Sequence, residues 1–148
     1  MTVESVELRQ ASPADADFIY RLIETTMRSY VEQVWGSFSE ENNRKNIAET
    51  IAAKNYSIIR CRGEDVGAIS VERHPDFVKL SQLFILPQHQ NRGIGTSLVR
   101  ELASEAQQAG MPVRLRVLRN NPARRLYERL GFRVSSITLE RVYMELHA

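Results

Sequence analysis

The chain has 148 residues, of which 43% are apolar and 26% charged, and its formal net charge is +2. These values predict one globular domain over residues 1–148, and the low net charge gives no reason to expect a nucleic-acid partner. No apolar run reaches membrane length, and no signal segment opens the chain, so we expect no membrane partner. A single cysteine, Cys61, excludes a disulfide within the chain. Together these features predict a cytoplasmic protein.

The first half of the chain predicts a strand, two helices and three antiparallel strands. Residues 3–10 alternate between apolar and polar, which is typical of a strand. Ser12 and Pro13 suit the start of a helix that ends at Gly36, and Ser37 or Ser39 can cap the next helix. The three strands that follow are predicted at 56–61, 66–71 and 78–86, with a turn at 62–65 and another at 74–76.

The second half predicts a helix, a strand, a short helix and two strands. The first helix follows the loop at 90–96 and ends at Gly110, a typical C-terminal glycine. A strand at 113–118 and a helix ending at Leu130 come next, and 132–146 holds two short strands. This order predicts an α+β fold with a single mixed, mostly antiparallel sheet flanked by helices.

The loop between the strand at 78–86 and its helix has the features of an anion site. Gly93 and Gly95 let a ligand approach the backbone, because they carry no side chain. The first N–H groups of the helix have no intrahelical partner and suit a phosphate. Two familiar phosphate loops are excluded: the dinucleotide fingerprint needs glycine where Leu98 stands, and no Gly-Lys-Ser/Thr triplet occurs.

The motif Gln-x-x-Gly-x-Gly at 90–95, after a strand that ends in Leu-Pro, resembles the pyrophosphate loop of the GNAT superfamily of acyl-CoA-dependent N-acyltransferases. A second GNAT signature resembles Asn-x-x-Ala-x-x-x-Tyr-x-x-x-Gly-Phe, with Asn120, Ala123, Tyr127, Gly131 and Phe132 on it. Both motifs occur in the family's order. The subgroup that the chain resembles is bacterial and mostly without assigned substrates.

The resemblance implies acetyl-CoA as acyl donor, no metal, and a central strand pair that splays to admit the pantetheine arm. The residues that it places at the donor are Phe84, Ile85, Leu86, Gln90, Arg92, Gly93, Ile94, Gly95, Thr96, Asn120, Ala123, Arg124 and Tyr127. Amides of the loop would hold the pyrophosphate, and those of strand residues 84–86 would pair with pantetheine and polarise the thioester carbonyl. Asn120 would touch the pantetheine arm from the opposite side.

Three residues are candidates for acid–base catalysis. The resemblance places the Tyr127 hydroxyl near the thioester sulfur as general acid, and its alternative is a core tyrosine. No carboxylate stands on the strand at 78–86, where many family members have one. Glu72, acting through water, and His74, whose ordinary pKa suits the task, are therefore the candidate bases.

The acceptor is predicted to be a primary amine of a small molecule or a peptide. In this fold its pocket lies beside the first two helices, where Tyr30, Glu32 and Trp35 are the candidate contacts, and an inward Glu32 would favour a cationic amine. The alternative is that Tyr30 and Trp35 only close the core. An exposed strand of the last hairpin also predicts a homodimer.

Direct transfer without a covalent enzyme intermediate is expected, since Cys61 lies outside both motifs. A non-catalytic acyl-CoA-binding sensor or regulator remains the alternative function, because it needs the loop but no base. A regulator that binds another nucleotide is a third option, against which the motif at 120–132 argues.

Overall fold

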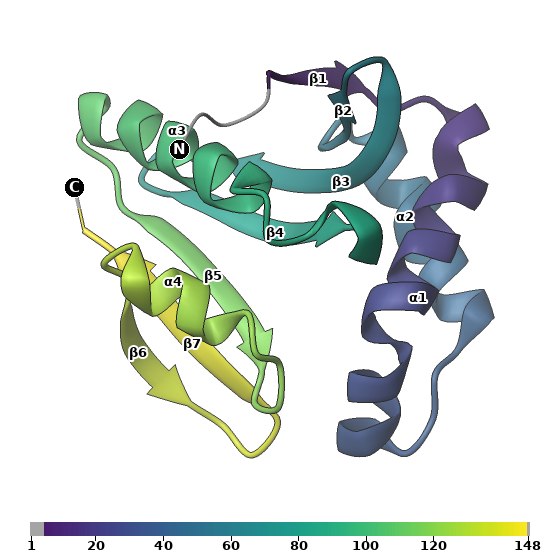
Figure 1. Ribbon diagram of the computed structural model, residues 1–148. Helices are drawn as coiled ribbons and strands as arrows, with labels where there is room; N and C mark the ends of the chain where they lie inside the picture. Colours follow the sequence, from purple (N-terminus) through teal and green to yellow (C-terminus); the bar gives the residue numbers. More distant parts are fainter. Residues whose placement is uncertain (1–4, 148) are drawn as a thin grey trace.

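The computed structural model describes residues 5–147 and contains one seven-stranded sheet with helices on both faces (Figure 1). Along the chain the strands are β1 (Val6–Gln10), β2 (Tyr56–Cys61), β3 (Glu64–Arg73), β4 (Val78–Ile85), β5 (Val113–Leu118), β6 (Arg133–Ile137) and β7 (Arg141–Leu146). Their order in the sheet is β1-β2-β3-β4-β5-β7-β6, and only β4 and β5 pair in parallel. The predicted mixed, mostly antiparallel sheet is therefore confirmed; Val3 lies outside the described residues.

The helices are α1 (Ala16–Trp35), α2 (Glu40–Ala52), α3 (Ile94–Gln108) and α4 (Arg124–Arg129), with short 3-10 turns η1 (Pro13–Asp15) and η2 (Pro87–His89). One core cluster joins α3 and α4 to one face of the sheet, and a second joins α1 and α2 to the other face. Figure 1 shows α3 in front of β3 and β4, and α4 in front of β5 and β7. None of the described helices is long and apolar enough to span a membrane.

The β2–β3 hairpin differs from its prediction at the turn. Cys61 pairs directly with Glu64, so only Arg62 and Gly63 form the connection, and β3 starts two residues earlier than expected. Both turn residues have positive φ, at 54° and 78°. A two-residue turn of this kind matches the right-handed twist of the strands, so the ladder extends to the turn itself.

The centre of the sheet opens because β4 contains an extra residue. Ser70 of β3 pairs with Gln82 while Val71 pairs with Leu80, so Ser81 has no opposite residue and forms a bulge. The next strand, β5, pairs with β4 only over Val78–Leu80 and not beyond. A bulge bends its strand and increases the local twist. The bend turns the rest of β4 away from β5, and the two strands part.

The faces to which the side chains of β4 point also reflect the bulge at Ser81. Val78 and Leu80 belong to the core cluster under α3, and Leu83 and Ile85 pack against that same cluster. A regular strand would place residues 80 and 83 on opposite faces. The extra residue at 81 shifts the alternation by one. The end of β4 can therefore keep packing against α3 while it leaves β5.

Candidate active site

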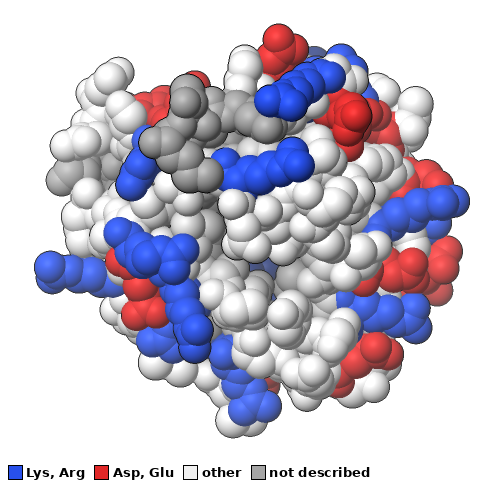
Figure 2. All heavy atoms as spheres, viewed as in Figure 1, with Lys and Arg blue, Asp and Glu red and all other residues white. Residues whose placement is uncertain are grey.

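Two cavities meet where β4 and β5 part. The larger measures about 560 Å³ and lies along the loop at 89–96, and we call it the loop cavity. The smaller measures about 310 Å³ and lies between α1 and the strands β4 and β5, and we call it the strand cavity. Six residues line both: Met27, Leu83, Phe84, Asn121, Ala123 and Tyr127. Figure 2 shows a hollow near the middle of the molecule's face, between the areas that α3 and α4 occupy in Figure 1.

The glycine loop forms one wall of the loop cavity. Gly93 is the N-cap of α3 and has φ +81°, a conformation that favours glycine. The first hydrogen bond of the helix runs from the amide of Ser97 to the carbonyl of Gly93, so the amides of residues 94–96 lack an intrahelical acceptor. The side-chain amide of Gln90 donates to the carbonyl of Ile85 over 2.9 Å and fixes the loop to the strand end.

Gly95 leaves room for a ligand rather than for the protein. A Cβ built on it would approach only side-chain carbons, the nearest being Cδ1 of Ile85 at 3.5 Å, which is an ordinary contact. Packing inside the protein therefore does not demand glycine here, although Gly95 lines the loop cavity. Free amides, a helix N-terminus and this open backbone fit a phosphorylated group such as the pyrophosphate of CoA.

Basic residues of α4 complete the loop cavity, but not those predicted. Arg125 and Arg129 line it, one helical turn apart. The Nε atom of Arg124 instead lies 3.3 Å from the carboxylate of Glu128, and Arg92 stands beside His89 outside the cavity lining. Helical spacing could have indicated Arg125 and Arg129, because residues four apart share a face. Figure 2 shows basic side chains gathered over the area of α4.

The end of β4 offers fewer backbone groups than predicted. The amide of Leu86 donates to the carbonyl of Val66 over 2.9 Å and is therefore engaged with β3. The carbonyl of Phe84 also faces β3, since a Cβ on Gly67 would lie 2.2 Å from it. The N–H and C=O groups of successive residues point alternately to the two sides of a strand. The backbone groups of Leu83 and Ile85 therefore point toward the opening, and both residues line the loop cavity.

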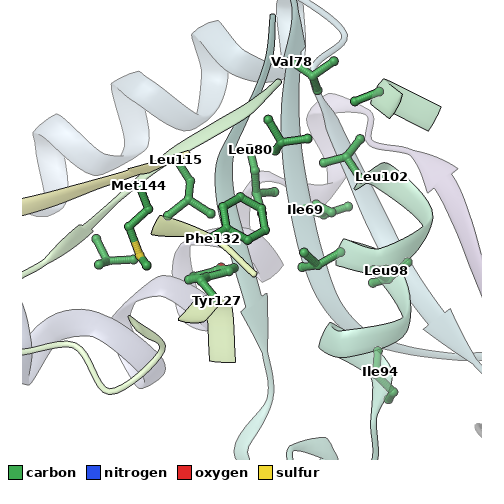
Figure 3. Packing of buried hydrophobic residues seen from close by; sticks show 14 of the residues in the cluster. Ile69, Val78, Leu80, Ile94, Leu98, Leu102, Leu115, Tyr127, Phe132 and Met144 are labelled. Atoms are coloured by element: carbon green, nitrogen blue, oxygen red, sulfur yellow. The ribbon is translucent and has the colours of Figure 1, made fainter. Parts of the chain in front are cut away.

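Tyr127 lies at the meeting point of both cavities. Only 6% of its surface is exposed, and its ring meets that of Phe132 edge to face, with centroids 5.6 Å apart. Figure 3 shows the two rings side by side within the core under the sheet. No hydrogen bond joins the Tyr127 hydroxyl to another residue of the described range 5–147. Burial raises the pKa of Tyr127 to about 12, so the hydroxyl is protonated at neutral pH and can donate.

The two neighbouring asparagines have different surroundings. Asn120 donates to the side chain of Gln33 over 2.9 Å and to the carbonyl of Tyr30 over 3.3 Å, and it lines neither cavity. Asn121 lines both, and its side-chain oxygen accepts the amide of Ala123 over 2.9 Å at the start of α4. The motif spacing had pointed to Asn120. An asparagine just before a helix can accept a hydrogen bond from the backbone amide two residues on, and this turn chemistry could have pointed to Asn121.

Neither Glu72 nor His74 lines the strand cavity. The hydroxyl of Ser81 donates to Glu72 over 2.9 Å, and Ser81 lines the cavity although Glu72 does not. His74 lies 3.3 Å from the same carboxylate and stacks on Phe77. The hydrogen bond from Ser81, together with the nearby charge of Lys79, lowers the pKa of Glu72. Its carboxylate is therefore ionised at neutral pH.

The three candidate acceptor contacts on α1 lie in different surroundings. Trp35 lines the strand cavity and is half exposed, whereas Tyr30 lines the loop cavity. Glu32 lines neither and faces Arg28 at 3.6 Å. Most of the strand-cavity lining was not predicted from the sequence, including the polar residues Gln82, Arg116 and Arg141. The side-chain oxygen of Gln82 accepts a hydrogen bond from the buried hydroxyl of Tyr56, whose pKa burial raises.

The site lies where the parallel strands β4 and β5 part. The glycine loop can hold an anion on one side of the opening, and a second cavity lies on the other, so two ligands can meet within the sheet. Residues 51–134 match the sequence model described as an acetyltransferase (GNAT) domain, so the chain belongs to the GNAT acetyltransferase family. Enzymes of this family transfer an acyl group from an acyl-CoA. The predicted family and fold are thus confirmed.

Solved structures share the fold at low sequence identity. An acetyltransferase from Thermus thermophilus superposes with a TM-score of 0.79 at 19% identity, covering 100% of both chains. The PaiA N-acetyltransferase of Thermoplasma acidophilum, in complex with coenzyme A, gives 0.74 at 19% identity over 97% of this chain and 99% of its own. Ard1 from Thermoplasma volcanium gives 0.71 at 18% identity and 97% of each chain. A search of curated proteins finds no match.

Proposed function

We propose that the protein transfers an acetyl group from acetyl-CoA to a primary amine, by direct attack and without a covalent enzyme intermediate. The observation that carries this proposal is the meeting of two cavities at Tyr127, one of which is lined by the glycine loop. The donor would enter through the loop cavity and the amine through the strand cavity. Their reacting atoms would then meet in the opening between β4 and β5.

The donor would be held by its phosphates and by its extended arm. Amides of residues 94–96 and the guanidinium groups of Arg125 and Arg129 suit the phosphates. Peptide groups of Leu83 and Ile85 would pair with the amides of the arm and donate to the thioester carbonyl as negative charge develops on its oxygen. The acyl thioester supplies the electrophilic carbon; all other steps fall to the chain's own residues.

In the reaction the amine nitrogen forms a bond to the acyl carbon, and the carbon–sulfur bond breaks. The sulfur leaves with the bonding electrons and takes the proton of the Tyr127 hydroxyl. Because the pKa of Tyr127 is about 12, the hydroxyl keeps its proton until the carbon–sulfur bond breaks. The tyrosine regains a proton from solvent before the next turnover.

The amine proton has a path toward Glu72. The hydroxyl of Ser81 lines the strand cavity and already donates to the carboxylate, so it can accept a proton from the amine while it passes its own to Glu72. The lowered pKa of Glu72 makes this carboxylate a weak base. His74, beside the same carboxylate, is the second candidate for the terminal acceptor.

The test is a turnover assay with acetyl-CoA and a panel of small amines and short peptides, following free thiol by colour and the acetylated product by mass spectrometry. Product from at least one amine supports the proposal. Tight binding of acetyl-CoA in calorimetry with no product from any amine would favour the alternative, a non-catalytic acyl-CoA sensor. Absence of both would overturn the assignment of the loop cavity.

A further inference from the structure

The strand cavity is positively charged. Its charged lining residues are Arg116 on β5 and Arg141 on β7, and its other polar lining residues are neutral: Asn43, Ser81, Gln82 and Asn121. No carboxylate of the described chain lines it. Glu145, a diagonal neighbour of Arg116 on β7, is bound by Arg114 at 2.8 Å, and Glu72 on β3 is bound by Ser81, His74 and Lys79. Nothing in the lining therefore neutralises the two guanidinium groups.

Both arginines are available to a ligand, unlike Arg114 on the same strand as Arg116. Neither Arg116 nor Arg141 has an ion-pair partner among residues 5–147, and the guanidinium of Arg141 lies 5.5 Å from the centre of the Trp35 ring. Arg114, two residues before Arg116 on the same face of β5, is bound to Glu145 at 2.8 Å. The charge of Arg114, which does not line the cavity, is thus neutralised by Glu145, whereas no carboxylate of the described chain neutralises the two arginines that do line it.

The strand register puts the two groups side by side. Arg116 pairs with Tyr143, and Arg141 pairs with Leu118, so the arginines are diagonal neighbours on one face of the β5–β7 ladder. Such neighbours have backbones roughly 7–8 Å apart, within reach of long side chains. A carboxylate can accept two parallel hydrogen bonds from a guanidinium, and such pairs are strong and geometrically specific.

We infer that the acceptor is a small amine that carries a carboxylate, as an amino acid does, with the carboxylate bound by Arg116 and Arg141. The inference rests on the proposed function, whose acceptor site it occupies. An inward Glu32 would have favoured a cationic amine, but the Glu32 side chain does not line the cavity and lies 3.6 Å from Arg28.

The same charge also eases the reaction. An amine must lose its proton before it attacks, and nearby positive charge disfavours the protonated form and lowers the pKa of the amine. The arginines would therefore supply part of what a strong base would otherwise have to do. This accounts for a cavity that lacks a carboxylate and has only the weakly basic Glu72 within reach through Ser81.

The first experiment compares common amino acids with their α-carboxamides by kcat/KM. The amides have the more readily deprotonated amine, so a simple reactivity effect would favour them. We expect the carboxylates to be preferred by about tenfold or more, as for a hydrogen-bonded charge pair of about 1.5–3 kcal/mol. A preference for the amides, or for diamines, would overturn the inference. Peptides with an acidic second residue form another arm, and their preference over free amino acids would assign the carboxylate to a peptide.

Substitutions of the two arginines test whether they cause the preference for carboxylate substrates. Arg116→Gln and Arg141→Gln should each raise KM for the carboxylate substrates about tenfold more than KM for the amides, so that the preference for the carboxylates narrows. The matched control is Arg114→Gln, which removes the same charge from the same strand face outside the cavity and should keep the preference. An equal loss in the control would reduce the effect to general electrostatics and contradict the inference.

Binding gives a readout that does not depend on turnover. Trp35 is the chain's single tryptophan, and it lies against Arg141, so a carboxylate bound there should change its fluorescence. Titration of the protein with each amino acid and its amide, in the presence of CoA, should show saturation for the carboxylates and lose it in Arg116→Gln. Saturation without turnover would separate failure of the proposed chemistry from failure of the recognition. Equal titrations with both members of each pair would overturn the recognition itself.

Discussion

At the scale of single residues, Gly93 decides whether the loop can hold an anion. Its φ of +81° favours glycine, and the amides that follow it are free. Gly93→Asp should weaken CoA binding on the order of 100-fold, because it places negative charge beside the phosphates and each lost charged hydrogen bond is worth about 1.5–3 kcal/mol. Calorimetric titration measures the change.

The control is Gly93→Ala, which shares the backbone cost but adds no charge. Its affinity should stay within about tenfold of the wild type, since the conformational penalty of about 1–2 kcal/mol falls mainly on stability. Equal affinities of both variants and the wild type would remove the loop from the binding site.

Tyr127 is the second decisive residue. Tyr127→Phe removes a hydroxyl that has no protein partner in the described chain, so the melting temperature and CoA affinity should hardly change. Turnover should fall roughly ten- to a thousandfold if the hydroxyl protonates the leaving sulfur. Because burial raises the pKa of Tyr127 to about 12, the wild-type rate should show no loss from tyrosine ionisation up to about pH 10. Unchanged turnover in the variant would leave Tyr127 as a core residue only.

At the scale of elements, the junction of β1, η1 and α1 depends on Asp15. Its carboxylate accepts two hydrogen bonds from Arg9, at 2.8 and 2.9 Å, and the amide of Ser12 at 2.8 Å. The hydrogen bonds from Arg9 lower the pKa of Asp15 despite its burial. A lowered pKa means that the carboxylate stabilises the fold above its unfolded pKa and that this contribution is lost as the pH falls below about 4.

Asp15→Asn should therefore lower the free energy of unfolding by about 1–2 kcal/mol at pH 7, a value reduced because Arg9 is partly exposed. Urea denaturation at pH 7 and at pH 3 measures it. The difference between wild type and variant should shrink at pH 3. A difference that stays constant with pH would mean that packing, and not the charge, holds the junction.

The elements were predictable, but their pairing was not. Periodicity and glycine positions placed every described strand and helix to within a few residues. The bulge at Ser81 leaves no mark in composition, because it arises from how β4 fits against β3. For the same reason the direction of the Leu86 amide and the choice of Asn121 over Asn120 followed only from the three-dimensional contacts. The charge of the strand cavity was hidden too, since Arg116 and Arg141 stand on different strands.

At the scale of the whole molecule, the donor would join two parts of one sheet. β4 and β5 share only three residue pairs, and the larger cavity has walls on both sides of the opening. A ligand that binds only the folded state at 100 times its Kd adds about 2.7 kcal/mol. Thermal unfolding with CoA at that excess should raise the melting temperature by roughly 5–10 °C. ATP at the same concentration is the control, and an equal rise would indicate a general anion effect.

A homodimer through the last hairpin remains a prediction. All five residues of β6 are exposed at the sheet edge, and Ile137 and Leu139 have 64% and 77% of their surface exposed. Light scattering after gel filtration should give twice the mass of 17.0 kDa, and Ile137→Lys should return the protein to the monomer mass. A wild-type mass of one chain at micromolar concentration would refute it.

The parting of β4 from β5 also bears on aggregation. A sheet that divides acquires two inner edges, and exposed edges recruit strands from other chains. Here α1 contacts both β4 and β5, and α4 supplies Leu126 and Tyr127 to the walls, so both edges are enclosed. The molecule thus keeps unpaired backbone groups available for a small ligand, while the surrounding helices hinder their pairing with strands of other chains.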